Sequence, residues 1–97
     1  MPTYITLAKW TDQGIRNVKE SLQRLDAFKK AAEAAGGKMI GFYLTLGEYD
    51  MVVIVEVPSD EAAAALILST GKGGNVRTTT MKAFPEDQYR GIIANVR

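Results

Sequence analysis

The chain contains no cysteine and no histidine among its 97 residues. Without cysteine it has no disulfide framework, no thiolate nucleophile and no zinc finger. Without histidine it lacks the commonest general base and the usual ligand of haem and transition metals. Carboxylates remain as metal ligands, but they do not follow the spacing of a calcium loop. We therefore expect no metal site and no cofactor.

Long apolar runs and an excess of charge of one sign are also missing. No apolar run reaches about 18 residues and no signal peptide opens the chain, so we expect a cytoplasmic protein with no membrane partner. Twelve Lys and Arg residues against eleven Asp and Glu give a net charge of +1, which argues against nucleic acid as a partner. With 46% hydrophobic residues, the composition predicts one folded domain over residues 1–97.

The first third of the chain changes from a strand period to a helix period. Residues 3–9 alternate in the manner of a half-buried strand. Thr11 or Asp12 can cap the helix that follows, by accepting a hydrogen bond from a free backbone N–H. Between residues 15 and 32 apolar side chains recur at spacings of three and four, which predicts one long amphipathic helix. The glycines at 36–37 end it.

Residues 38–46 and 49–57 predict two strands around a Gly47-Glu48 turn. This register places only apolar pairs on one face: Leu44 with Met51, Phe42 with Val53, and Ile40 with Val55. The opposite face is mixed: Thr45 pairs with Asp50, Tyr43 with Val52, Gly41 with Ile54, and Met39 with Glu56. A slip of one residue would destroy this separation of the two faces, so the pattern strongly favours the hairpin.

The remaining segments predict one more strand and two helices. Residues 58–61 open a helix whose body, 62–68, is small and apolar, and a glycine-rich loop follows at 69–74. Residues 75–84 predict a fourth strand. A short last helix begins at 85–87, and its apolar side chains again follow helical spacing: Tyr89, Ile92, Ile93 and Val96.

The predicted order is strand, helix, strand, strand, helix, strand, with a terminal helix. This is the split βαβ arrangement of the α+β class, a four-stranded antiparallel sheet with two helices on one face. The other face of the sheet is left without cover, and its apolar content exceeds what a soluble monomer exposes. We expect a second copy and a ligand to cover it, with two sheets around a partly polar cavity. The residues predicted for this open face are Tyr4, Thr6, Ala8, Met39, Tyr43, Thr45, Asp50, Val52, Ile54 and Glu56.

Three motifs in order resemble the GYD-domain family of small bacterial and archaeal proteins. They are Gly47-Glu48-Tyr49-Asp50, the segment from Lys9 to Gly14, and the segment from Gly74 to Thr80 that runs into Ala83-Phe84. The resemblance covers nearly the whole chain. It implies a ferredoxin-like fold of the dimeric α/β-barrel type, in which the sheets of two protomers pack face to face as a homodimer or a larger homo-oligomer. The positions that carry the family motifs are Thr11, Gly14, Gly47, Tyr49, Asp50, Asn75 and Arg77.

The turn at Gly47, Tyr49 and Asp50 is the most distinctive candidate site, and two interpretations are open. In the functional one, Tyr49 and Asp50 line a pocket mouth, with Asp50 as acceptor or base for a small ligand. In the structural one, which we favour, Gly47 supplies a positive φ while Asp50 accepts hydrogen bonds from backbone N–H groups of the turn.

Glu56 also allows two interpretations. A carboxylate among apolar neighbours has a raised pKa and can accept a proton. Alternatively, Glu56 forms a structural ion pair with Lys82 or Arg77, across the sheet or across a dimer. Asp50 and Glu56 lie about 20 Å apart if the strand is regular, so they cannot form an acid/base pair within one subunit. The candidate ligand pocket consists of Tyr4, Thr6, Tyr43, Thr45, Asp50, Val52 and Glu56.

The remaining motifs do not predict a phosphate, anion or RNA site. The glycines at 71–74 follow a helix instead of preceding one, which excludes a phosphate-binding loop. Thr11 to Gly14 favours a capped helix over an anion site, and we expect Asn75 and Arg77 to anchor the adjacent loop or to reach a partner subunit. The third strand, 49–56, has acids where RNA-recognition domains carry a basic residue.

Two functions remain. We favour a homo-oligomeric module that binds or senses a ligand on the open sheet face. The alternative is a cofactor-independent oxygenase or isomerase for a small apolar or aromatic substrate, with Tyr43, Asp50 and Glu56 as its polar groups.

Overall fold

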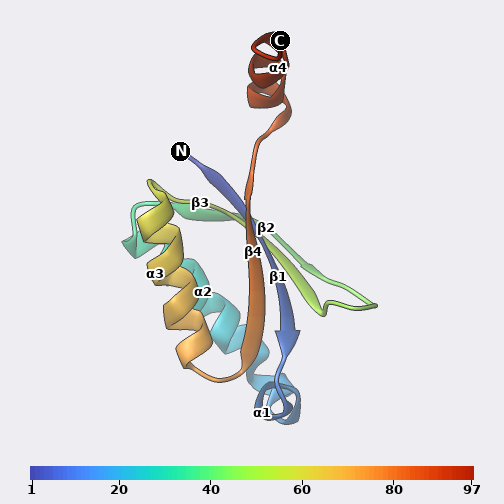
Figure 1. Ribbon diagram of the computed structural model, residues 1–97. Coiled ribbons are helices and arrows are strands. Elements are labelled where there is room, and N and C mark those ends of the chain that lie inside the picture. Colours follow the sequence, from blue (N-terminus) through green and yellow to red (C-terminus); the bar gives the residue numbers. More distant parts are fainter.

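The computed structural model describes residues 1–97 and contains one four-stranded antiparallel sheet in the order β2-β3-β1-β4 (Figure 1). Its two long helices, α2 and α3, lie on the same side of the sheet (Figure 1). No helix has both the length and the apolar character needed to cross a bilayer. The elements are β1 (Thr3–Trp10), α1 (Asp12–Arg16), the 3₁₀ turn η1 (Val18–Glu20), α2 (Ser21–Ala34), β2 (Lys38–Leu44), β3 (Met51–Glu56), α3 (Asp60–Lys72), β4 (Val76–Ala83) and α4 (Glu86–Ala94).

This is the predicted ferredoxin-like arrangement. The order of strands and helices, the antiparallel pairing and the placement of both helices on one face are confirmed. The core lies between the sheet and the two helices, where small helix residues allow close approach to the strands. Its buried members are Tyr4, Val53, Val55 and Val57 from the sheet side, with Ala32, Ala63 and Leu66 from the helices.

The prediction of one continuous helix from residue 15 was wrong at Asn17. There the backbone leaves helical geometry (φ −103°, ψ 25°), and α1, η1 and α2 follow as separate pieces. Asparagine favours such breaks because its side chain competes with the helical hydrogen bonds. Arg24 donates from Nη1 to the Asn17 carbonyl oxygen (3.2 Å). The apolar spacing also overstated the core, since Ile15 and Leu22 are exposed.

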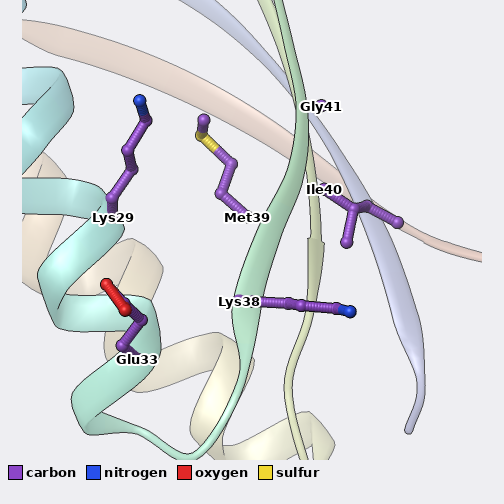
Figure 2. A pocket seen from close by; sticks show the side chains of 6 residues that line it. All are labelled: Lys29, Glu33, Lys38, Met39, Ile40 and Gly41. Carbon is purple, nitrogen blue, oxygen red and sulfur yellow. The ribbon is translucent and has the colours of Figure 1, made fainter.

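The predicted hairpin register holds from Gly41 to Leu44 and fails beyond Gly41, and residues 45–50 form the connecting loop in place of the predicted two-residue turn. The pairs from Gly41–Ile54 to Leu44–Met51 are as predicted. Beyond them Ile40 is an extra residue, a β-bulge, so Met39 pairs with Val55 in place of Ile40. Figure 2 shows the result: the Met39 side chain points towards α2, whereas Ile40 points away from it. The expectation that Met39 lies on the open face is therefore corrected.

The structure also corrects which side of β1 is open. Tyr4, Thr6 and Ala8, predicted for the open face, are buried on the helix-covered side. Ile5 and Leu7 point to the open side instead, since they pair with Ile54 and Val52. Both alternating sets of β1 are apolar or small, so strand periodicity cannot decide between them.

The last helix stands apart from the rest of the molecule. β4 continues through Phe84 and Pro85 into α4, which lies beyond the end of the sheet and clear of α2 and α3 (Figure 1). The extents of the molecule are 50 × 31 × 17 Å. The sequence predicts this helix but not its separation from the core.

Candidate functional site

The open face of the sheet carries two apolar cross-strand rows. In one row, Tyr43, Val52 and Leu7 are neighbours on β2, β3 and β1, and Thr79 follows on β4. In the other, Gly41, Ile54, Ile5 and Met81 are neighbours in the same strand order. Residues directly opposite in antiparallel strands share a face, so these side chains form one surface. We call Ile5, Leu7, Tyr43, Val52, Ile54 and Met81 the open-face patch.

Only two of the predicted pocket residues belong to the open-face patch. Tyr43 and Val52 belong to it, and Tyr43 is 61% exposed. Glu56 lies in the row beyond Ile54, next to Lys38 and Thr3. Thr45 and Asp50 lie at the opposite end of the hairpin, beyond the last strand pair. Along the strands, polar groups therefore lie on both sides of the apolar rows.

Tyr4 instead joins a polar cluster between the sheet and the start of α3. Its hydroxyl donates to the Asp60 carboxylate, and the Lys82 ammonium lies 3.3 Å from that same carboxylate. Burial, the hydrogen bond to Asp60 and the negative charge of that carboxylate together raise the pKa of Tyr4 to about 12. The hydrogen bond from Tyr4 and the Lys82 charge hold the pKa of Asp60 below its ordinary value. Sequence reasoning missed Asp60 as Tyr4's partner, because no local pattern links residues 56 positions apart.

Thr6 has a comparable internal role. Its hydroxyl lies 2.9 Å from that of Thr80 on the neighbouring strand β4, and its side chain is buried. The pair lies on the helix-covered side of the sheet, so Thr6 has no access to the open-face patch.

The hairpin turn is held to the end of β1 through Asp50. The Asp50 Oδ2 atom accepts from the Trp10 backbone N–H (3.0 Å), and the Asp50 N–H donates to the Ala8 carbonyl oxygen (2.9 Å). The loop itself closes at Thr45, whose N–H donates to the Asp50 carbonyl oxygen (2.8 Å). Gly47 has the predicted positive φ, +135°. These contacts agree with the structural interpretation of Asp50, although the N–H that it accepts belongs to β1 and not to the turn.

The other family motifs meet in a second clamp, between the start of α1 and the loop before β4. The Thr11 hydroxyl accepts from the Gly14 N–H (3.1 Å) and donates to the Gly74 carbonyl oxygen (2.6 Å). The Thr11 N–H donates to the Asn75 carbonyl oxygen (3.0 Å), and the Gln13 amide donates to the Asn75 Oδ1 atom (3.0 Å). Thr11 is thus the predicted helix cap, and Asn75 anchors the loop as expected.

Arg77 and Glu56 do not form the ion pair that one interpretation proposed within the chain. Lys82, the other predicted partner of Glu56, pairs with Asp60. Arg77 is exposed on β4, opposite Lys9 of β1. Lys9 in turn lies over the ring of Tyr49, with its Nζ atom 5.1 Å from the ring centroid. An ion pair across a dimer stays a prediction.

Two hollows of about 420 Å³ each lie beside the helices. The first lies between α2 and β2 and is largely polar, lined by Lys29, Glu33, Lys38, Met39, Ile40 and Gly41 (Figure 2). The second runs between α3 and β4 and is mainly apolar, with the Asp60–Lys82 pair at its edge. We call this second hollow the α3–β4 groove. Its other lining residues are Tyr4, Ala63, Ala64, Ile67, Leu68 and Thr80.

Comparison with known proteins gives one family and one curated relative. The profile of the family described as "GYD domain" matches residues 4–93. A protein of Thermus thermophilus named "Glutamine synthetase and cystathionine beta-lyase binding protein" is 31% identical over 86 residues, which cover 88% of this chain and 90% of the relative.

Solved structures share the fold at low sequence identity. The crystal structure of MtbAldR superposes with a TM-score of 0.68 at 10% identity, and covers 88% of this chain. This chain corresponds to only 52% of the MtbAldR chain. The crystal structure of FFRP-DM1 superposes with a TM-score of 0.59 at 24% identity, over 87% of this chain and all of the other.

Proposed function

Because this chain belongs to the GYD-domain family, we propose that it is a homo-oligomeric binding module whose copies pair through the open-face patch and whose partner is a metabolic enzyme. The observation that carries the proposal is the patch itself. Its two apolar rows cross all four strands and lie on the side of the sheet that no helix of the chain covers. An apolar surface of this kind marks an interaction site.

Self-pairing is the arrangement that the pattern of the patch supports best. Along the strands, polar groups flank the two apolar rows, with Glu56 on one side and the hairpin loop on the other. Two copies related by a two-fold axis would therefore bury apolar centres against each other and keep polar rims in water. Each square ångström of apolar surface buried between the copies contributes about 25 cal/mol to the free energy of association. The residues of the predicted pocket that remain on this side are Tyr43, Val52 and Glu56, and they would line any ligand held between the sheets.

The name of the curated relative supports the choice of an enzyme as partner. That protein is named for binding glutamine synthetase and cystathionine beta-lyase, and 31% identity spans most of both chains. The enzymatic alternative has less support. Asp50 Oδ2 is engaged by a backbone N–H, and Tyr4 and Thr6 lie on the other side of the sheet.

The test places a charge in the centre of the patch. We expect native mass spectrometry to show the parent as a dimer or larger assembly. Ile54→Lys should weaken association at least about 100-fold, because pairing would bury an unpaired ammonium group. Ala27→Lys, on the exposed side of α2, is the matched control and should leave assembly unchanged.

The same variants test the partner. Purified glutamine synthetase and cystathionine β-lyase from the source organism are immobilised, and binding of each variant is measured by interferometry. We expect the parent and Ala27→Lys to bind at least one enzyme equally, and Ile54→Lys to bind more than about tenfold more weakly. A parent that is monomeric at about 50 μM would overturn the assembly. Binding to neither enzyme would overturn the choice of partner.

A further inference from the structure

α4 presents an apolar stripe that no part of its own chain covers. Tyr89, Ile92 and Ile93 follow the i, i+3, i+4 spacing of one helix face, and Val96 follows just beyond the end of the helix. All four side chains are between 42% and 67% exposed. An isolated nine-residue helix is too short to be stable in water on its own. The stripe therefore needs an apolar surface to pack against.

The α3–β4 groove is such a surface. Ala64, Ile67 and Leu68 form one wall on α3, and Leu68 is 73% exposed. The groove is open to solvent along its side, which suits a helix face better than an enclosed small molecule. Each chain thus carries one uncovered apolar helix and one uncovered apolar groove.

Charges on the two surfaces are complementary. Glu86 and Arg90 form an i, i+4 ion pair on α4 (2.6 Å), at one flank of the apolar stripe. Lys82 and Asp60 form a pair at the edge of the groove (3.3 Å). When the stripe lies in the groove, Glu86 can face Lys82 while Arg90 faces Asp60. Exposed pairs of this kind contribute little affinity, but they fix the orientation of the docked helix.

The linker directs α4 away from the groove of its own chain. Only Phe84 and Pro85 separate β4 from α4. A proline restricts the residue before it to extended conformations, and Pro85 itself has φ −58° and ψ 163°. The chain therefore continues in the direction of β4, and α4 extends outward from the sheet (Figure 1).

From these four observations we infer that α4 of each copy docks in the α3–β4 groove of a second copy, in a reciprocal exchange of helices. Reciprocal exchange closes into a two-fold dimer, whereas one-way docking would build filaments. The groove lies on the helix-covered side of the sheet, so this interface is separate from the open-face patch. Both interfaces together give an assembly larger than a dimer.

The absence of cysteine allows a clean cross-linking test. In the full chain, Leu68→Cys combined with Ile92→Cys is oxidised mildly and separated under non-reducing conditions, and Ala64→Cys with Ile92→Cys is tested in parallel. We expect a covalent dimer from at least one pair. We also expect a hetero-dimer when the corresponding single-cysteine variants are mixed.

The matched control is Leu68→Cys with Ala94→Cys. Position 94 is only two residues from Ile92 but points to the far side of the helix, so its yield should be less than about one-tenth. An intrachain disulfide in a fast-migrating monomer would show that α4 folds back onto its own groove, and would overturn the exchange. Equal yields at positions 92 and 94 would overturn it as well.

Repeating the experiment with Ile54→Lys separates this inference from the proposed function. We expect the cross-linked dimer to persist, because the open-face patch is not part of the exchange. Loss of the cross-link in that variant would overturn the exchange as an independent interface. A parent that dimerises through the patch but gives no cross-link would keep the proposed function and refute the exchange.

Discussion

At the residue scale, Gly14 occupies a contact that leaves no room for a side chain. A Cβ atom built there would lie 1.9 Å from the Asn75 carbonyl oxygen. That carbonyl accepts from the Thr11 N–H, so it cannot move without loss of the clamp between α1 and the loop before β4. The family motifs around residues 9–14 and 74–80 thus join the end of β1, where α1 begins, to the loop that leads into β4.

We therefore predict that Gly14→Ala lowers the free energy of unfolding by about 2–4 kcal/mol, through overpacking against backbone. The control is Gly71→Ala in α3, where a Cβ would meet nothing within 4 Å. That change should be neutral or stabilise the fold by up to about 1 kcal/mol, since alanine favours helix. Urea unfolding followed by circular dichroism measures both. A loss below about 1 kcal/mol for Gly14→Ala would show that the clamp yields easily.

The cluster of Tyr4, Asp60 and Lys82 predicts how stability depends on pH. The pKa of Tyr4 is raised from 10.0 to about 12 in the folded chain, so its contribution is complete below pH 10 and is lost between pH 10 and 12. The pKa of Asp60 is lowered, so its contribution is present above pH 3.8 and is lost as the pH falls through the lowered value. Stability should therefore decline at both extremes.

Tyr4→Phe separates this cluster from other titrating groups. It removes the phenol, so its unfolding free energy should fall less between pH 10 and 12 than that of the parent. Tyr49→Phe is the control, because the Tyr49 hydroxyl takes no part in the cluster, and it should follow the parent. Denaturant midpoints at each pH provide the measurement. If Tyr4→Phe and the parent declined in parallel, Tyr4 would not be the group responsible.

At the scale of elements, the hairpin shows how far the sequence can be read. The register from Gly41 to Leu44 follows from matching apolar residues across two strands, because only one pairing separates the faces. The bulge at Ile40 leaves no such signal. Lys38, Met39 and Ile40 allow either alternation, and packing of Met39 against the core decides between them. Local patterns determine pairing near a turn but not an extra residue farther away.

β1 and α4 show the same limit of local patterns. The pattern identifies each element, but it does not determine which face of β1 is buried or where α4 lies. The two sets of alternating residues in β1 are equally suited to a core, and Tyr4 is placed by its bond to Asp60, which is distant in sequence. As a result, the strand order was predictable, whereas the two β1 members of the candidate pocket were assigned to the wrong side. For α4 the helical spacing was readable, but the Phe84-Pro85 linker, not the apolar stripe, determines where the helix lies.

At the scale of the whole molecule, the thin core predicts that the proposed assembly contributes to stability. Only 12 of 97 residues are buried, while the open-face patch, the α4 stripe and the α3–β4 groove are all uncovered in one chain. A domain of this size gains a smaller share of its stability from its own core than a larger one does. Burial between copies would therefore add a substantial part.

We predict that the thermal midpoint of the parent rises with protein concentration. For a dimer that unfolds to separate chains, a tenfold rise in concentration adds about 1.4 kcal/mol per dimer. With about 2.1 cal/mol/K of unfolding entropy per residue over two chains, this corresponds to an increase of about 3 °C. Calorimetry at about 5, 50 and 500 μM measures it. Ile54→Lys, which keeps only the exchange of α4, should show about this increase, whereas the parent and Ala27→Lys should show a larger one because their assembly releases more chains on unfolding. A midpoint constant across this range would mean that the open-face patch stays exposed in solution.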